Sequence, residues 1–145
     1  MPSKLNAGDR FPSLTIDFVG GGELSIPEGM EAKYKVVLFY RDHWCPFCRR
    51  QLVGYEERKL EFDKLDTQIL TASIDTGENS QLVQDEVSFS IGEGVSRETA
   101  DALGSWWKDR RSIIQPSEFL LGMDNAILYS SYSSGSIVRT LAEDM

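Results

Sequence analysis

The 145-residue sequence has little cysteine and histidine: two cysteines, Cys45 and Cys48, and one histidine, His43. A pair of cysteines so close together cannot supply the several bridges on which small secreted folds depend. A zinc site typically needs four ligands, so zinc would have to recruit carboxylates or a second subunit. The composition therefore disfavours a disulfide scaffold and a structural metal centre, and thiols kept reduced fit a reducing compartment.

Long apolar runs and excess positive charge are also missing. No stretch approaches the ~20 apolar residues of a membrane span, and the start, "MPSKLNAGDR", lacks the apolar core of a secretion signal. The 15 Lys and Arg against 23 Asp and Glu give a formal charge of -8, which repels nucleic acid and anionic lipid. We expect a cytoplasmic protein that binds neither nucleic acid nor a membrane and needs no cofactor.

The apolar content, 41% of the residues, suffices for one core, so residues 1–145 are expected to form a single domain. Residues 14–18 and 24–26 alternate apolar with polar around the turn "VGGGE" and predict an N-terminal hairpin. Residues 36–40, "VVLFY", predict a central strand buried on both faces. A second apolar strand is expected at residues 68–74.

Helical periodicity follows the first of these strands, from the cysteines to about residue 65. A short helix capped by Asn79 or Ser80 and a third helix from Ser96 to near Trp107 are expected further on. A late hairpin joins residues 118–121 to 127–132, and the tail 136–145 suggests a closing helix. The fold class is therefore mixed α/β, a central mixed sheet flanked by helices with an N-terminal hairpin extension.

Both cysteines lie in "HWCPFC", where a strand passes into a helix. A sulfur at a helix start meets unpaired backbone N–H groups and the positive end of the helix dipole, which lower a thiol pKa from ~8.5 toward ~3.5–7.5. Cys45 is placed to be that sulfur, because Pro46 suits the first helical position. Cys48 shares the face of the same turn and can attack an oxidised Cys45.

Charged and aromatic neighbours modify this expectation. Arg41, Arg49 and Arg50 would add positive potential near the sulfur, whereas Asp42 opposes it. His43 is a candidate proton carrier or an ordinary loop residue. Trp44 would shield the sulfur or simply pack in the core. An exposed indole from Trp106 or Trp107 is a possible homodimer contact.

Three readings of the cysteine pair remain open at this point. The pair is a redox couple, half of a metal site shared across a dimer, or two inert thiols packed as small hydrophobes. A Cys-X-X-Cys string beside a strand, helix, strand unit favours the redox couple.

The run "VVLFYRDHWCPFCRRQL", preceded by "AGDRFPSLTI" and followed by "ILTASID" and "QPSEFLLGMDNAIL", resembles the peroxiredoxin-like branch of the thioredoxin fold. This branch includes the alkyl hydroperoxide reductases and thiol-specific antioxidant proteins. The resemblance covers most of the chain. It implies a thioredoxin-like sheet flanked by helices, with the first cysteine at a helix N-terminus.

The resemblance also implies roles for residues outside the motif. Gln115 and Pro116 match the site of a cis-proline that faces the active cysteine, although an ordinary trans proline stays an alternative. Arg110 or Arg111 matches a distant arginine that stabilises the thiolate, or is a solvated turn residue. Typical members carry a proline and a hydroxyl residue ahead of the peroxide-attacking cysteine, and here Leu38 and Asp42 stand there.

The expected function is that of a thiol-disulfide oxidoreductase or thiol peroxidase. Cys45 attacks a peroxide or disulfide, Cys48 resolves the product to a disulfide, and an external thiol of the thioredoxin, glutaredoxin or glutathione type resets the pair. A disulfide reductase without peroxidase activity is the alternative enzyme. A thiol-based binding module or shared metal site is the alternative outside enzymes.

Overall fold

The computed structural model describes residues 4–43, 45–110 and 112–135. Its central strand is β3 (Tyr34–Phe39), in which every residue after Tyr34 is buried. Val37 and Phe39 belong to one apolar core, whereas Val36 and Leu38 belong to the other. Alternate side chains of a strand point to opposite faces, so β3 separates the two cores. The expected strand buried on both faces is confirmed.

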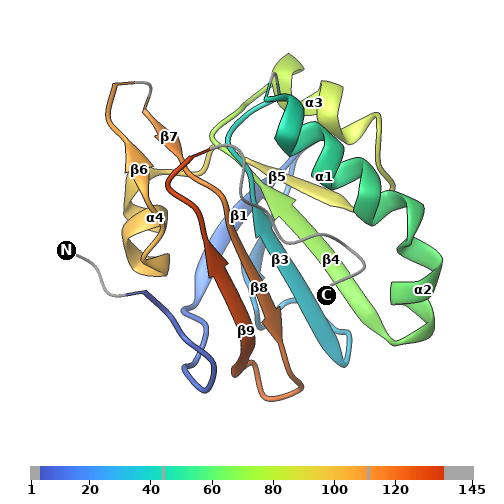
Figure 1. Ribbon diagram of the computed structural model, residues 1–145. Helices are drawn as coiled ribbons and strands as arrows, with labels where there is room; N and C mark the ends of the chain where they lie inside the picture. The colour runs from blue at the N-terminus through green and yellow to red at the C-terminus, as the bar shows by residue number, and fades with distance from the viewer. Residues whose placement is uncertain (1–3, 44, 111, 136–145) are drawn as a thin grey trace.

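A seven-stranded mixed sheet surrounds β3, in the order β2-β1-β5-β4-β3-β8-β9 (Figure 1). Strands β3, β4 and β5 are parallel, while β8 and β1 run antiparallel to their neighbours. The N-terminal hairpin extends the sheet through the pairing of β1 with β5, and the late hairpin forms the other edge, as predicted. The bounds are β1 (Leu14–Phe18), β2 (Glu23–Ile26), β4 (Thr67–Ala72), β5 (Ser90–Glu93), β8 (Ser117–Leu121) and β9 (Ile127–Tyr132).

Helices cover both faces of this sheet (Figure 1). Three helices pack on the core of one face: α1 (Pro46–Glu57), α2 (Lys59–Lys64) and α3 (Glu78–Gln84). They contribute Leu52 and Tyr55, Phe62, and Val83 to that core, respectively. The other face is packed by α4 (Arg97–Leu103) and by the N-terminal segment. The expected sheet flanked by helices is confirmed. None of the helices in the described part of the chain has the length and apolarity that a bilayer crossing requires.

On the α1 side, the predicted end of the helical segment near residue 65 is confirmed by α2, but the continuity of that helix and the cap of α3 were predicted wrongly. The helix expected to run to about residue 65 is broken at Arg58, whose backbone (φ -104°, ψ 12°) leaves the helical range. Helix α3 begins at Glu78 and follows Gly77, so neither Asn79 nor Ser80 caps it. Gly77 has φ 59°, a left-handed conformation that glycine adopts without steric cost, and it turns the chain into the helix.

The helix expected from Ser96 to near Trp107 is also shorter than predicted. Ser96 caps it as expected, because its side chain accepts the Thr99 N–H. The helix then stops at Gly104, whose φ of 76° is the common left-handed helix end. Trp107 lies instead in β6 (Trp107–Lys108), which pairs with β7 (Ile113–Ile114). These two short strands and β5 were not expected, and the predicted closing helix lies outside the described residues.

Gly92 allows a close approach between the N-terminal hairpin and the parallel strands. A Cβ at Gly92 would overlap Cγ2 of Ile16 and lie 3.0 Å from Cβ of Ala72. We predict that Gly92→Ala lowers the free energy of unfolding by about 1–3 kcal/mol. Gly54→Ala is the control, because nothing lies within 4 Å there and alanine favours a helix by about 0.5–1 kcal/mol. Urea unfolding of both variants measures the difference. An unchanged free energy of unfolding in Gly92→Ala would contradict this close approach.

Candidate functional site: a cysteine pair at a helix start

Cys45 is the N-cap of α1, and it lies just beyond the C-terminal end of β3. Its extended backbone (φ -75°, ψ 111°) is typical of an N-cap. Its Sγ accepts the backbone N–H of Cys48, with 3.4 Å between sulfur and nitrogen. Pro46 occupies the first turn, where its missing N–H costs nothing. The predicted position of Cys45 at the helix start is therefore confirmed.

Cys48 lies one turn into α1 and has its own backbone donor. The Arg41 N–H donates to Cys48 Sγ across 3.4 Å. Both cysteines are reduced and buried, with 1% of Cys45 and none of Cys48 exposed. An N–H donor stabilises a thiolate more than a neutral thiol, so each sulfur has a backbone group that favours its ionised form.

The arginines around the pair differ in what they do. Arg49 reaches from α1 to Glu86, where its Nε donates to Oε2 across 2.9 Å, and it also donates to the carbonyl oxygen of His43. The hydrogen bond with Glu86 raises the pKa of Arg49. Arg49 therefore ties the loop before Cys45 to the segment after α3. Arg50 is exposed and lies over the Phe47 ring, so its charge faces solvent.

Two side chains with an acidic group, besides Arg41, are buried immediately before the pair. Asp42, at the position where the resemblance places a hydroxyl, has only 1% of its surface exposed. Tyr40 is fully buried, and this burial raises the pKa of its phenol. The charges of Asp75 and Cys48 act in the same direction on Tyr40. Tyr40 therefore stays neutral beside the thiols.

His43 contacts a carboxylate that the sequence analysis did not identify. Its Nδ1 lies 3.4 Å from the Asp75 side chain, and Asp75 is buried. Asp75 follows β4, the parallel neighbour of β3, and the C-terminal ends of parallel strands meet at one edge of a sheet. That topology, read from "ILTASID", was the signal that could have found Asp75. The contact fixes the ring of His43 two residues before Cys45.

Gln115 and Pro116 are buried directly before β8, at the same end of the sheet. The register pairs Phe39 with Ser117, and its continuation sets Gln115 opposite Arg41. The expected cis bond at Pro116 is wrong, because the one cis peptide bond in the described ranges joins Ile26 to Pro27. Pro116 enters β8 in trans, its carbonyl accepting the Ser133 N–H at the end of the β8–β9 hairpin.

Arg110 is exposed, which fits a solvated turn residue better than a thiolate partner. Trp44 and Arg111 lie outside the described residues. Within the described ranges, no three His, Cys, Asp or Glu side chains gather as they would around a metal ion.

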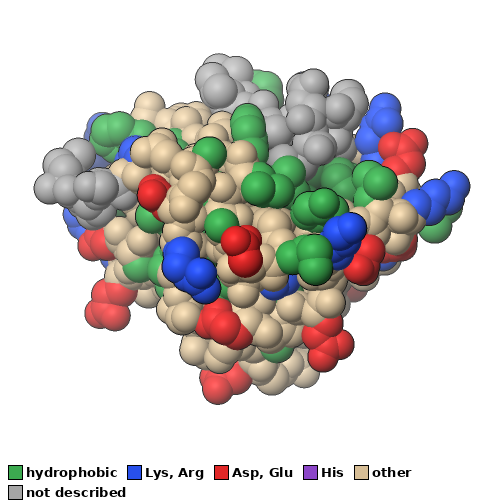
Figure 2. Space-filling model, turned by 90° about the horizontal axis from the view of Figure 1, so that it is seen from below, with side chains coloured by type: hydrophobic (Ala, Val, Ile, Leu, Met, Phe, Trp, Pro, Cys, Tyr) green, Lys and Arg blue, Asp and Glu red, His purple; other side chains and the backbone are tan. Residues whose placement is uncertain are grey.

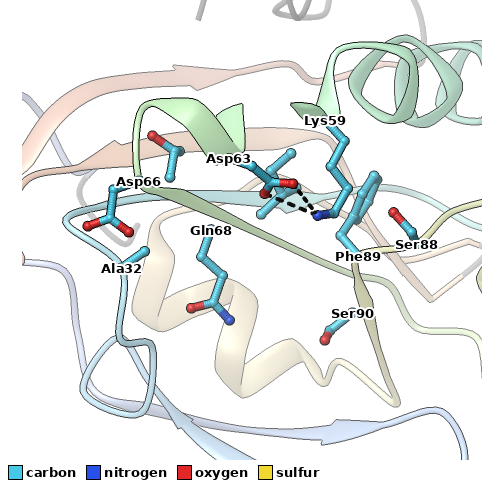
Figure 3. Close-up of a pocket in the computed structure, with 10 residues that line it drawn as sticks. Ala32, Lys59, Asp63, Asp66, Gln68, Ser88, Phe89 and Ser90 are labelled. Atoms are coloured by element: carbon cyan, nitrogen blue, oxygen red, sulfur yellow. Dashed lines mark hydrogen bonds and ion pairs between the residues drawn. The ribbon is translucent and has the colours of Figure 1, made fainter. Parts of the chain in front are cut away.

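A polar cavity of about 290 Å³ lies at the opposite end of the sheet, where β4 and β5 begin (Figure 3). Its charges are already engaged, because Lys59 pairs with Asp63 and Asp66 accepts the Lys33 N–H. Figure 2 views that end of the molecule and shows hydrophobic side chains among scattered charges. At the start of β4, Leu65 and Leu128 line an apolar groove together with Thr67. Neither hollow is lined by a cysteine, so the candidate site stays at the cysteine end of the sheet.

The amino-acid sequence of the chain matches those of known proteins. Residues 7–130 match the AhpC/TSA family. The chain is 24% identical to alkyl hydroperoxide reductase C of Mycobacterium tuberculosis (strain ATCC 25618 / H37Rv) over 161 residues, covering 96% of this chain and 80% of that protein. A peroxiredoxin of Archaeoglobus fulgidus is 29% identical over 68 residues, which cover 47% of this chain and 31% of that protein.

Solved structures share the fold. Mycobacterium bovis AhpC superposes with a TM-score of 0.79 at 21% identity, covering 97% of this chain and 89% of that chain. The peroxidoxin BcpB of Mycobacterium tuberculosis gives 0.81 at 14% identity, with 91% and 88% covered. The thioredoxin-like fold expected from the resemblance is therefore confirmed.

Burial of Tyr40 predicts a pH dependence of stability. A phenol whose pKa is raised by folding stabilises the protein below the unfolded pKa of about 10 and loses that contribution as the pH rises further. Stability should therefore fall from about pH 9.5 upward, and Tyr40→Phe should make this fall shallower by up to ~1.4 kcal/mol per pH unit. Urea unfolding at pH 8, 10 and 11 measures both slopes. Parallel slopes would show that Tyr40 ionises freely in the folded state.

Proposed function

The chain belongs to the AhpC/TSA family and is a thiol-dependent oxidoreductase of the peroxiredoxin-like type, and we propose that Cys45 is its attacking thiol and Cys48 its resolving thiol. One observation carries this assignment. Cys45 Sγ caps α1 and accepts the N–H of Cys48, so the two cysteines occupy one turn and the first is held at the positive end of the helix.

In the first step the Cys45 thiolate attacks one oxygen of a peroxide. A sulfur–oxygen bond forms, the oxygen–oxygen bond breaks, and the second oxygen leaves as water or an alcohol after it takes up a proton. Cys45 is then a sulfenic acid, oxidised by two electrons. The N–H of Cys48 and the dipole of α1 favour the thiolate with which the step begins.

In the second step the Cys48 thiol attacks the sulfur of that sulfenic acid. The Cys45–Cys48 disulfide forms, and the hydroxyl leaves as water. The Arg41 N–H that reaches Cys48 Sγ favours the attacking thiolate. An external thiol of the thioredoxin, glutaredoxin or glutathione type then reduces the disulfide in two exchanges and completes the cycle. Pro46 supports the geometry by fixing the first turn.

A second candidate within the enzyme class is disulfide exchange without efficient peroxide reduction. Asp42 favours it, because a buried carboxylate stands where the resemblance places a hydroxyl that holds a peroxide oxygen. A carboxylate near the reacting sulfur also opposes ionisation of the thiol. In this cycle Cys45 attacks a disulfide instead of a peroxide, and Cys48 releases the reduced product from the mixed disulfide.

Replacement of each cysteine separates the two roles. We predict that Cys45→Ser abolishes both peroxide reduction and disulfide exchange. Cys48→Ser should keep the first oxidation but stop the cycle there, so that a sulfenic acid or mixed disulfide accumulates on Cys45. Stopped-flow oxidation and intact-mass measurement follow both reactions. Full activity in Cys45→Ser would refute the assignment, and a hydrogen peroxide rate no faster than that of a free thiol would leave disulfide exchange as the function.

Asp42 is predicted to limit the reaction with peroxide. Asp42→Thr supplies a hydroxyl and removes the negative charge, so the rate constant for oxidation by hydrogen peroxide should rise by about tenfold, the value of one hydrogen bond in the transition state. Asp42→Asn is the control, because it removes the charge without adding the hydroxyl. An equal rise in the oxidation rate of both variants would assign the effect to charge alone. An oxidation rate unchanged in both would show that Asp42 does not limit the reaction with peroxide. Thermal melting of both proteins controls for lost stability.

A further inference from the structure

A third cavity, of about 350 Å³, lies between β6 and the loop that follows β3. Arg41, Trp106, Trp107, Lys108 and Gln115 line it, together with the chain after β9. Figure 1 shows the β6–β7 hairpin beside the end of the sheet at which α1 begins. The volume is in the range of small-molecule sites, roughly 300–1,000 Å³. We call these five side chains the basic pocket.

The basic pocket is cationic on a protein whose formal charge is -8. It contains the side chains of Arg41 and Lys108, and none of the described residues that line it is acidic. The ammonium of Lys4 lies outside this lining: it donates to the carbonyl oxygen of Gly104 and lies 4.2 Å from the centre of the Trp106 ring. A hollow with this lining attracts an anion although the molecule as a whole repels one.

Two buried polar atoms in the basic pocket lack a hydrogen-bond partner among the described residues. They are Nε of Arg41, a donor whose residue is 8% exposed, and Oε1 of Gln115, an acceptor whose residue is 2% exposed. Leaving such atoms unpaired costs about 1–3 kcal/mol each, so a ligand that reaches them by a small displacement of the lining side chains gains affinity. A ligand that carries both a carboxylate and an N–H group matches this donor and acceptor.

The basic pocket also adjoins the cysteine pair. Arg41 lines the pocket with its side chain while its backbone N–H donates to Cys48 Sγ. The continued β3–β8 register sets Gln115 across from Arg41. The basic pocket and Cys48 therefore share Arg41, whose side chain lines the pocket and whose backbone N–H reaches the sulfur.

We propose that the basic pocket binds the carboxylate of a small peptide-like thiol, and that this thiol reduces the Cys45–Cys48 disulfide. The proposal rests on the proposed function, because it names the class of reductant for the same site. Arg41 and Lys108 hold the carboxylate, Gln115 Oε1 accepts an N–H of the ligand, and the indoles of Trp106 and Trp107 cover its apolar part.

The reaction needs two molecules of the thiol. The first, as a thiolate, attacks Cys45 Sγ; a mixed disulfide forms, the Cys45–Cys48 bond breaks, and Cys48 leaves as a thiolate that accepts the Arg41 N–H and then takes a proton. The second thiolate attacks the sulfur of the bound thiol. It releases the small-molecule disulfide and returns Cys45 as a thiolate, so the protein gains two electrons and the two thiols lose them.

Binding is tested without redox chemistry. S-methylglutathione carries carboxylates and amides but no thiol, so calorimetric titration of the reduced protein reports the pocket alone. We expect saturable binding that weakens by about tenfold or more in Lys108→Met and Arg41→Met, the loss of one charge-assisted hydrogen bond. Lys64→Met, which removes the same charge from the exposed surface of α2, should bind like the wild type. No binding, or equal loss in Lys64→Met, would overturn the proposal.

The rate of disulfide reduction supplies the second readout. The oxidised protein should be reduced faster by glutathione than by its diethyl ester, and Lys108→Met should erase that preference while its rate with dithiothreitol, which has no carboxylate, stays unchanged. Equal rates for glutathione and the ester would refute the carboxylate site. The protein could instead be oxidised faster by a fatty-acid hydroperoxide than by the methyl ester of that hydroperoxide, while glutathione and its ester reduce it at equal rates. That result would show that the pocket binds the oxidant and would refute its assignment to the thiol. Failure of dithiothreitol to reduce any Cys45–Cys48 disulfide would instead refute the proposed function.

Discussion

A sulfur atom serves as the N-cap of α1, and the geometry of the candidate site depends on that one contact. Serine, threonine, aspartate and asparagine usually occupy this position because their side-chain oxygens bind the exposed N–H groups of a helix start. Here Cys45 Sγ accepts a hydrogen bond from the backbone N–H of Cys48. The same atom therefore begins the helix and is the proposed attacking thiol. The loop before Cys45 is short and follows β3 directly, so a strand buried on both faces fixes the position of the sulfur.

Contacts from several elements hold this loop in place. Arg49 binds both Glu86 and the carbonyl oxygen of His43, and the Asp75 side chain meets the ring of His43. On the sheet side of α1, Gln51 donates to the buried carboxylate of Glu118 on β8 across 3.0 Å. Charge on this acidic protein is thus unevenly distributed. Carboxylates and Arg49 tie elements together around the cysteines, while Arg41 and Lys108 line the proposed ligand pocket.

The sequence predicts most of the fold because its signals are strong where burial is complete. The run that contains Val37 and Phe39 allows only a strand buried on both faces, and Pro46 after Cys45 indicates a helix start. The helix ends were harder. Arg58 interrupts a continuous periodicity, and Gly104 stops α4 before Trp107, through backbone conformations that periodicity does not encode. The four-residue β5 and the two-residue β6 and β7 were missed because such short strands have little pattern of their own.

The candidate site was predicted where it is local in the chain and missed where it is not. Cys45, Cys48 and Arg41 lie within one short segment, so their proximity follows from a strand and a helix start. Asp75 reaches the site from β4, and a partner from another strand is found only when the order of the strands is known. The trans peptide bond at Pro116 corrects an expectation taken from the resemblance.

Burial of both sulfurs has a kinetic consequence. With 1% of Cys45 and none of Cys48 exposed, a bulky disulfide reaches sulfur only after a local opening of the structure, whereas a molecule the size of hydrogen peroxide needs far less displacement. The free energy of that local opening then enters the rate law as a pre-equilibrium for large substrates. Contacts such as that of Arg49 with Glu86 would add to this opening free energy, and each tenfold slowing for large substrates corresponds to about 1.4 kcal/mol.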